Sequence, residues 1–410
     1  MSPEIFLWIF IALVLFEYFF STILDYVNDK NWKDEIPEIL KNFYDNKNYT
    51  KARDYKIERG KISFVSTTIS VLITLCFLWF EGFGILSNYI AEDYSSPFAQ
   101  TAIFFLVLFI FNTIISLPFS YYSTFYIEEK FGFNKTTLKT FIMDKIKGIL
   151  LSVLIGGVLL WAAMYLLSVF NEGFWIWLWI GLSAFMVFIN MFYAELIVPI
   201  FNKLTPLKDG SLREKIEKYS KKVGYSLKNI YVIDGSKRST KANAFFSGLG
   251  PKKTIALYDT LIEKHGEEEL VAVLAHEVGH YKRKHIFSSM IFTIIELGIM
   301  CFLFEMCMNQ TIIAEALGSN QMYFHLGLIG FSFLYSPVGL ITGILSNMRS
   351  RKNEFEADDY ARSTYDGPSL ELALKKLSVD SLSNLYPHPL FVFVHYSHPP
   401  LLQRLEALGK

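Results

Sequence analysis

The sequence predicts a mainly helical membrane protein, in which a bundle of seven transmembrane helices carries an α+β domain on its cytoplasmic side. Three observations lead to this prediction. Hydrophobic residues make up 52% of the 410 residues and charged residues only 19%, against about 25% charged residues in an ordinary soluble protein. Seven stretches are long and apolar enough to cross a bilayer. Lys and Arg gather in alternate connecting segments, as they do in membrane proteins of fixed orientation.

The transmembrane helices are predicted from length and hydropathy. A helix needs about 20 mostly apolar residues to cross the hydrocarbon core of a bilayer. The stretches that meet this requirement are Ile5–Leu24, Ile62–Phe83, Ala99–Ser120, Gly148–Val169, Phe174–Phe201, Ile286–Met308 and Tyr323–Leu345. We therefore expect five transmembrane helices within residues 1–201 and two more within residues 286–345.

The distribution of positive charge predicts the orientation. The segments rich in Lys and Arg are the loops 28–61 and 121–147 and the longer segments 202–285 and 346–410. The connecting segments without Lys or Arg are 85–98, 170–173 and 309–322. Because positive loops stay in the cytoplasm, we expect the N-terminus outside and every large polar segment inside. Over the whole chain, Lys+Arg and Asp+Glu balance at 39 each, so composition gives no indication of a nucleic-acid partner.

The two long polar segments are expected to fold together because they lie on the same side of the membrane. Hydrophobic periodicity predicts a helix over Ser211–Val223 and a short strand over Ile230–Ile233. Ala244–Leu249 and Thr254–Tyr258 flank a Gly-Pro-Lys-Lys turn and are predicted to pair as a hairpin. The acidic residues Glu267–Glu269 then open a second helix, because negative charge is favourable at a helix N-terminus.

A metal-binding motif lies on this second helix. Residues 276–280 read His-Glu-Val-Gly-His. Positions i and i+4 share one face of a helix, so His276 and His280 can present their imidazoles to one point. This spacing suits zinc, and Glu277 can reach a water on the open side of the metal. The sequence therefore predicts one Zn²⁺ per chain in a zincin-like domain built from residues 202–285 and 346–410.

The third metal ligand is expected from the last polar segment. Asn353–Ala361 is a helical stretch in which Glu354 and Asp358 share a face. One carboxylate can bind the metal while the other orients a ligand imidazole, and spacing alone does not say which does which. His285 is one residue away from the position of a third histidine ligand in a known zincin pattern, and we expect it to be a polar residue at the membrane boundary.

A family resemblance adds to these residues. The chain resembles the CAAX prenyl protease 1 family, which are integral-membrane zinc metalloproteases of the gluzincin type. Besides the metal-binding helix 276–284 and the stretch Asn353–Ala361, the segments that carry the likeness are 122–134, 196–207, 242–245 (Ala-Asn-Ala-Phe) and 395–400 (His-Tyr-Ser-His-Pro-Pro) with Arg404. The likeness covers nearly the whole chain. The motif His-Glu-x-x-His alone indicates only a zincin, and the run at 395–400 is much more specific.

The resemblance implies a ligand set and an architecture. It implies Glu354 as the third zinc ligand and Asp358 as the residue that orients a ligand. Glu356 departs from the family pattern, which has an uncharged residue there. Family members enclose a water-filled chamber within seven helices. Such a chamber would explain the carboxylates Glu17, Glu195 and Glu296 inside predicted spans, together with Asn190, because charge within hydrocarbon is costly. Two further carboxylates, Glu81 and Glu305, lie near span ends, where side chains can extend to water.

The expected reaction is zinc-dependent hydrolysis of a peptide bond at the cytoplasmic face, and the family resemblance implies removal of the C-terminal tripeptide of prenylated CaaX proteins. Glu277 would transfer the proton of the attacking water to the leaving amine. His398 would donate a hydrogen bond to the oxyanion, and Arg404 would hold a carboxylate of the site in place. The strand containing Asn243, Ala244 and Phe245 would bind the peptide or protein substrate as an added strand.

Two other functions are compatible with the motif. A membrane-protein quality-control protease would use the same zinc chemistry without prenyl specificity. A transporter with a structural metal site would show paired repeats with broken helices, and the sequence contains no such repeats. Nothing in the chain identifies its source, and we expect a bacterial cytoplasmic membrane, or the endoplasmic reticulum membrane if the protein is eukaryotic.

Overall fold

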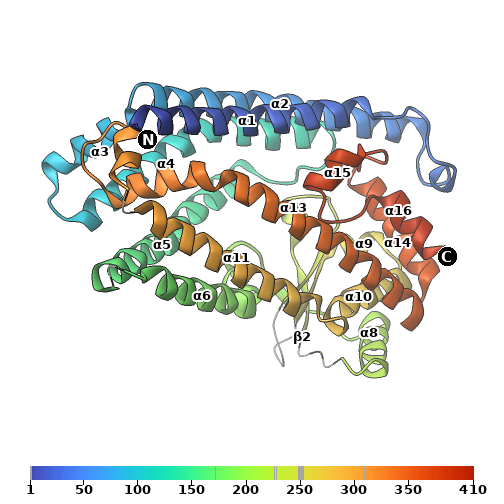
Figure 1. Ribbon diagram of the computed structural model, residues 1–410. Helices are drawn as coiled ribbons and strands as arrows, with labels where there is room; N and C mark the ends of the chain where they lie inside the picture. Colours follow the sequence, from blue (N-terminus) through green and yellow to red (C-terminus); the bar gives the residue numbers. More distant parts are fainter. Residues whose placement is uncertain (1, 171, 226, 228, 248–253, 309) are drawn as a thin grey trace.

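Long helices dominate the computed structural model (Figure 1). The structure describes residues 2–410 apart from 171, 226, 228, 248–253 and 309. Among the described residues, seven helices are long and apolar enough to cross a membrane. These helices are α1 (Pro3–Lys30), α2 (Asn46–Trp79), α4 (Pro97–Tyr122), α5 (Leu138–Phe170), α6 (Phe174–Leu196), α11 (His285–Met308) and α13 (Phe324–Thr364). The predicted seven-helix architecture is therefore confirmed, and each helix overlaps one predicted stretch, although α6 ends at Leu196 rather than at the predicted Phe201.

Some of these helices differ from the predicted boundaries. The second stretch was predicted to end at Phe83, but α2 ends at Trp79 and a separate helix, α3 (Gly82–Asp93), begins three residues later. Glu81 adopts a left-handed conformation (φ 56°) between them. Helix α13 continues unbroken from the seventh stretch through Asn353–Ala361. The predicted division between residues 345 and 346 thus falls inside one helix.

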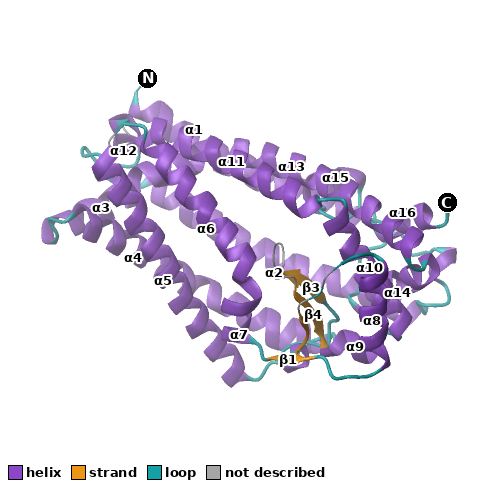
Figure 2. Ribbon diagram, turned by 90° about the horizontal axis from the view of Figure 1, so that it is seen from below, coloured by secondary structure: helices purple, strands orange, loops and turns teal. Residues whose placement is uncertain are grey.

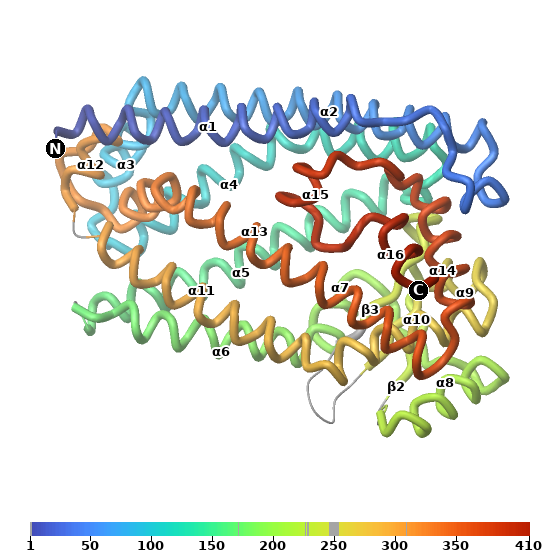
Figure 3. The backbone as a smooth tube through the Cα atoms, turned by 45° about the vertical axis from the view of Figure 1, so that its right-hand side comes forward, coloured from blue at the N-terminus to red at the C-terminus, as the bar shows by residue number. Residues whose placement is uncertain are grey.

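The shorter elements cap the two ends of the bundle. The remaining helices are α7 (Val198–Phe201), α8 (Ser211–Lys222), α9 (Asp259–Lys264), α10 (Glu267–Lys282), α12 (Thr311–Ala316), α14 (Gly367–Asp380), α15 (Pro389–His395) and α16 (Leu401–Leu408). Helices α3 and α12 lie near the N-terminus at one end of the bundle, whereas α8, α10, α14 and α16 gather near the C-terminus at the other (Figures 1 and 3).

A four-stranded sheet lies at the C-terminal end of the bundle (Figure 2). Its strands are β1 (Leu204–Pro206), β2 (Asn229–Ile233), β3 (Ala244–Ser247) and β4 (Thr254–Tyr258), in the order β1-β2-β4-β3. The predicted antiparallel pair β3–β4 is present, with Ala244 opposite Leu257, whereas residues 248–253 between the strands lie outside the described residues. Strand β2 runs parallel to β4 and antiparallel to β1, a strand that the sequence analysis did not predict.

The helix surfaces match two different surroundings. On α5, Leu150, Leu154 and Val158 recur on one face and are 65%, 65% and 57% exposed, as expected for side chains that contact lipid rather than water. At the sheet end, α10 instead buries Val271, Ala272 and other side chains in a core shared with α8, α14 and the sheet. The membrane bundle therefore keeps apolar side chains on its outer surface, whereas the polar domain buries them in a core.

Two intramembrane carboxylates have partners inside the bundle. Glu305 was expected to extend to water, but its two carboxylate oxygens accept hydrogen bonds from the backbone N–H groups of Gly173 (2.7 Å) and Trp175 (2.9 Å) at the start of α6. The first N–H groups of a helix have no partner within it, so Glu305 caps α6 from α11. Glu296 accepts a hydrogen bond from the hydroxyl of Thr342 at 2.5 Å.

Candidate active site

Helix α10 positions two of the predicted metal ligands. Its first turn contains Glu267, Glu268 and Glu269, whose charge is favourable at a helix N-terminus. No proline interrupts the helix, and its apolar face is buried through Ala275 and Val278. His276 and His280 consequently lie one turn apart on the side of α10 that faces α13.

The close approach of α10 to α13 depends on a glycine. A Cβ atom added at Gly279 would lie 3.0 Å from Cα of Ala357 and 3.1 Å from its carbonyl oxygen. Ala357 is itself fully buried. Small residues on both helices thus let the two backbones come near each other, and this approach brings Glu354 on α13 to the histidine pair.

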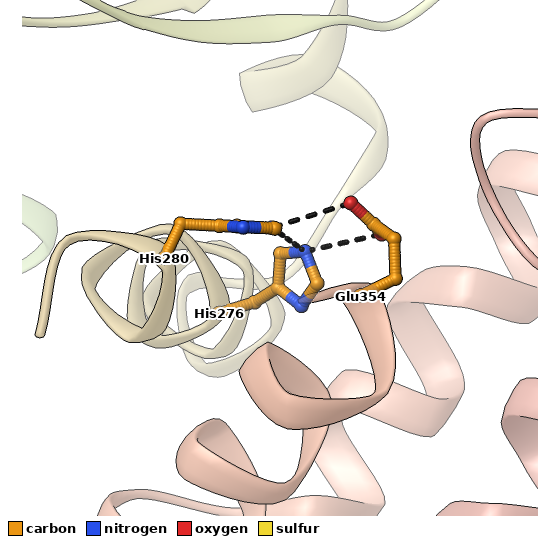
Figure 4. A group of neighbouring side chains, drawn as sticks. All are labelled: His276, His280 and Glu354. Carbon is orange, nitrogen blue, oxygen red and sulfur yellow. Dashed lines mark hydrogen bonds and ion pairs between the residues drawn. The ribbon is translucent and has the colours of Figure 1, made fainter. Parts of the chain in front are cut away.

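Three potential ligand atoms converge where the helices meet (Figure 4). The side chains of His276, His280 and Glu354 point toward one another, and one ligand atom from each lies within 4.8 Å of the others. His280 Nε2 is 3.2 Å from Glu354 Oε1, and His276 Nε2 is 3.5 Å from Glu354 Oε2. The two histidine Nε2 atoms are 3.1 Å apart.

The chemistry of these groups fits a zinc ion. Two imidazole nitrogens and one carboxylate oxygen are a ligand set of catalytic zinc sites, which leave a fourth position open. Glu354 is 4% exposed, and its Oε2 atom is buried without a hydrogen-bond partner among the described residues. This oxygen lies 3.3 Å from Nη1 of Arg404 and 3.5 Å from Nε2 of His276, and a bound cation would give it the direct contact that a buried carboxylate oxygen needs.

Asp358 and Arg404 surround the ligands. Asp358 Oδ1 is 2.8 Å from His276 Nδ1. The Arg404 guanidinium donates from Nε and Nη2 to the two oxygens of Asp358, at 2.8 and 2.6 Å, and its Nη1 is 3.3 Å from Glu354 Oε2. Burial opposes the charge of Arg404, but the hydrogen bonds that it donates to Asp358, together with the charges of Asp358 and Glu354, outweigh burial and raise the Arg404 pKa. The arginine therefore stays charged between two carboxylates.

The same carboxylates act on His276. Burial disfavours the charged imidazole, but the hydrogen bonds with Asp358 and Glu354 outweigh it and raise the pKa of His276 to about 9. The surroundings of His276 therefore attract positive charge. A divalent cation at the Nε2 side would supply that charge in place of a proton.

A cavity of about 570 Å³ opens in front of these residues. Its lining includes Glu277, His280, Glu354 and His398 from the polar domain. The transmembrane helices α6 and α11 contribute Met186, Asn190, Tyr193, Ile286, Met290 and Thr293. The cavity thus joins the predicted catalytic groups to the membrane bundle.

The four polar residues that were expected to line a hydrated space within the bundle lie in different surroundings. Asn190 lines this cavity, whereas Glu17 and Glu195 are exposed on α1 and α6. Glu296 is bound to Thr342, as described above. The hydrated space that was expected to hold all four groups stays a prediction.

His398 reaches the site from the C-terminal segment. Its Nε2 atom is 3.4 Å from Glu354 Oε1, and 65% of its side chain is exposed. The preceding helix α15 is anchored to α13, because Arg351 donates hydrogen bonds to the carbonyl oxygens of Val392 (2.9 Å) and Tyr396 (2.5 Å). Asn347, one turn earlier on α13, donates a hydrogen bond to the carbonyl oxygen of Val394 (2.7 Å). The turn that carries His398 is therefore fixed relative to Glu354.

The predicted substrate strand lies beside the cavity. Strand β3 is an edge strand of the sheet, so one of its sides has no neighbouring strand among the residues that the structure describes. The ring of Phe245 packs edge-on against Tyr193, with the ring centroids 6.0 Å apart, and Tyr193 lines the cavity. Asn243 precedes the strand, and its carbonyl accepts a hydrogen bond from the backbone N–H of Tyr258 (3.1 Å).

Two residues near the ligands were not predicted to belong to the site. His285 Nδ1 is 3.1 Å from His280 Nδ1, and His285 Nε2 is 3.0 Å from Glu356 Oε2. The sequence predicted His285 only as a polar residue at the membrane boundary, because it is one residue away from the third histidine position of a known zincin pattern. Lys284, with φ of 60°, separates α10 from α11 and redirects the chain. No sequence signal marks this turn.

Comparisons with known proteins agree over the whole chain. Residues 25–203 match the family described as "CAAX prenyl protease N-terminal, five membrane helices", and residues 206–410 match peptidase family M48. The crystal structure of S. mikatae Ste24p superimposes with a TM-score of 0.93 at 31% sequence identity, covering 99% of both chains.

Curated relatives extend this likeness. A CAAX prenyl protease 1 homolog of Oryza sativa subsp. japonica is 34% identical, over 97% of this chain and 96% of the relative. CAAX prenyl protease 1 of Saccharomyces cerevisiae is 32% identical, over 91% and 88%. The CAAX prenyl protease 1 homolog of Homo sapiens is 31% identical, over 98% and 95%. These relatives are eukaryotic, so the expectation of a bacterial membrane is not borne out.

Proposed function

The chain belongs to the CAAX prenyl protease 1 family, a group of membrane metallopeptidases within peptidase family M48, and we propose that it cleaves prenylated proteins near their C-terminus. The metal is zinc, held by His276, His280 and Glu354. The reaction takes place on the cytoplasmic side of the membrane, the endoplasmic reticulum membrane by analogy with eukaryotic relatives.

One observation carries this proposal. The ligand atoms of His276, His280 and Glu354 converge at the wall of a cavity that Glu277 also lines. A structural zinc site is closed by four protein ligands, whereas a catalytic site keeps one position open. Three ligands beside a cavity with a carboxylate support the catalytic kind.

The residues around the cavity suit peptide hydrolysis. When bound, zinc supplies the Lewis acidity that activates water and polarises the scissile carbonyl. Glu277 follows His276 on α10 and accepts the proton of the attacking water, which it then passes to the leaving amine. His398 donates a hydrogen bond to the oxygen that becomes negative as the carbonyl is attacked. Its exposed position at the mouth of the site leaves it free to meet the substrate.

The surroundings also suit the proposed substrate. Strand β3 offers an unpaired edge to the backbone of an extended peptide, a mode of binding that tolerates many sequences. On the membrane side, Met186, Ile286 and Met290 give the cavity apolar lining. An isoprenoid chain on the substrate would find apolar contacts there, as lipids and apolar ligands do.

The test compares purified protein with its Glu277→Gln variant on a farnesylated CaaX peptide and on the same peptide without the farnesyl group. We expect Glu277→Gln to retain zinc by elemental analysis and to lose at least about 100-fold in turnover, the range of general acid–base catalysis. Glu268→Gln, on the exposed part of the same helix, is the matched control and should keep full activity.

The outcomes separate the candidate functions. Equal turnover by the protein and Glu277→Gln would refute the catalytic role. Equal cleavage of the farnesylated and unmodified peptides would replace the proposal with a quality-control protease that has no prenyl specificity.

A further inference from the structure

A chain of three side chains leads away from the His280 ligand. His280 Nδ1 is 3.1 Å from Nδ1 of His285, and His285 Nε2 is 3.0 Å from Oε2 of Glu356. His285 is 6% exposed. The other oxygen of Glu356 faces the exposed Lys352, at 3.8 Å. His285 and Glu356, called the His285–Glu356 pair below, therefore connect the ligand with the surface of α13.

The proton positions along this chain follow from the carboxylate at its end. An ionised carboxylate only accepts hydrogen bonds, and a neutral imidazole has one N–H donor and one acceptor nitrogen. Glu356 therefore accepts from Nε2–H of His285, which leaves Nδ1 of His285 as an acceptor. This nitrogen must accept from Nδ1–H of His280. The lone pair of His280 then lies on Nε2, the atom that faces Glu354 and His276.

This is the tautomer that metal binding requires. A histidine binds zinc through a nitrogen that carries no proton, and the partner of its other nitrogen fixes which nitrogen that is. For His276, the partner of the other nitrogen is Asp358, whose Oδ1 atom lies 2.8 Å from Nδ1 of His276. For His280, the corresponding carboxylate is that of Glu356, and His285 links the two because it contacts both.

The backbone turn at Lys284 places His285 between His280 and Glu356. Lys284 has a left-handed conformation, with φ of 60°, which is unfavourable for a residue that carries a side chain. Helix α10 ends at Lys282 and α11 begins at His285. Without this turn, His285 would continue the path of α10 on a different face from His280.

We propose that His285 and Glu356 are positioning residues for His280, which hold its imidazole in the orientation and tautomer that bind zinc. The inference rests on the proposed function, since it concerns the same metal site. It predicts that zinc affinity depends on two residues that do not touch the metal, and that Glu356 acts only through His285.

The experiment measures zinc affinity rather than turnover. Glu356→Ala, His285→Ala and the double variant are made in the Glu277→Gln background, and each metal-free protein is titrated with zinc against a chelating dye. We expect each single variant to bind zinc about 10- to 100-fold more weakly, as for other residues that orient metal ligands. The double variant should lose no more than His285→Ala alone, because the two residues act as one unit. Glu356→Gln retains an acceptor oxygen and should lose less than Glu356→Ala.

Asp359→Ala is the matched control. Asp359 lies three residues from Glu356 on the same helix and pairs with Arg362 at the surface, so it should leave zinc affinity unchanged. Unchanged affinity in Glu356→Ala and His285→Ala, or losses that add up in the double variant, would overturn the inference while the proposed function stands. A Glu277→Gln parent that binds no zinc would overturn both.

Discussion

At the scale of single residues, Arg404 decides the charge balance of the site. Glu354 and Asp358 are 4% and 2% exposed, and Arg404 is 9% exposed between them. One guanidinium beside two carboxylates leaves one negative charge, which the positive metal would more than balance. Arg404 also meets Asp358 with two parallel hydrogen bonds, a geometry that lysine cannot reproduce.

Removal of Arg404 should therefore destabilise the protein as well as the site. Arg404→Ala leaves the buried Asp358 without its charged partner, and breaking a buried ion pair in this way costs about 3–5 kcal/mol. We expect a large drop in the midpoint of thermal unfolding in detergent, and a smaller drop for Arg404→Lys. Arg362→Ala, which breaks a surface pair with Asp359, should change stability by less than about 1 kcal/mol. Equal midpoints for Arg404→Ala and Arg362→Ala would contradict the role given to Arg404.

Single site residues could be predicted where local helix spacing relates them, but not where contacts between distant segments bring them together. His276, Glu277 and His280 could be proposed from five consecutive residues because a helix dictates their relative positions. The choice between Glu354 and Asp358 could not, because both share one face of α13 and only the crossing with α10 determines which carboxylate reaches the histidines. His285 depends on the turn at Lys284, which the sequence does not reveal.

At the scale of elements, a glycine contact joins α3 to the turn after α12. The backbone N–H of Gly84 donates to the carbonyl of Leu317 at 2.8 Å. A Cβ at Gly84 would lie 2.1 Å from the carbonyl oxygen of Gly318, and Gly318 has a φ of 90°. The two segments can approach this closely only because neither glycine has a side chain.

Gly84→Ala should accordingly separate α3 from the α12 turn. The overlap is with backbone atoms of Gly318, which cannot rotate away, so the variant should lower the free energy of unfolding by at least the roughly 1–3 kcal/mol of an overpacked core. Gly156→Ala on α5 is the control, because a Cβ there has no neighbour within 4 Å and alanine favours a helix. Thermal unfolding in detergent should distinguish them, and a Gly84→Ala variant as stable as Gly156→Ala would show that the turn rearranges freely.

The helices whose positions could be predicted from the sequence are those that hydropathy determines. All seven long apolar helices follow from this single property, since each must satisfy its backbone hydrogen bonds within the bilayer. The length of α13 did not follow, because its apolar stretch ends near Leu345 while its helix continues to Thr364. Strand β1 is three residues long and is recognisable only through its pairing with β2.

At the scale of the whole molecule, the charge pattern of the sequence corresponds to the two ends of the bundle. The Lys- and Arg-free segments that contain α3 and α12 lie with the N-terminus, and the polar domain lies at the opposite end (Figure 3). An odd number of crossings explains this separation of the N-terminus from the domain. The sequence could predict that residues 202–285 and 346–410 lie on the same side of the membrane. The hydrophobic core that joins them, which contains Leu270 of α10 and Leu370 of α14, could be identified only from the fold.

The orientation of the two ends in the membrane is the remaining prediction. Because the positive-inside rule assigns the Lys-rich end to the cytoplasm, we expect Ser95, between α3 and α4, to face away from the cytoplasm and Glu214 on α8 to face it. Both residues are exposed. The experiment introduces Ser95→Cys or Glu214→Cys after Cys76, Cys301 and Cys307 have been replaced by alanine. A membrane-impermeant maleimide is then added to sealed vesicles with their cytoplasmic face outward.

Only Glu214→Cys should react in intact vesicles, and both cysteines should react once the vesicles are permeabilised with detergent. Labelling of Ser95→Cys alone would invert the orientation and place the peptidase site on the other side of the membrane. Labelling of both in intact vesicles would contradict the path of the chain itself, because an even number of crossings would then have to separate residue 95 from residue 214. Three helices, α4, α5 and α6, lie between those positions, and an odd number of crossings must place the two positions on opposite faces.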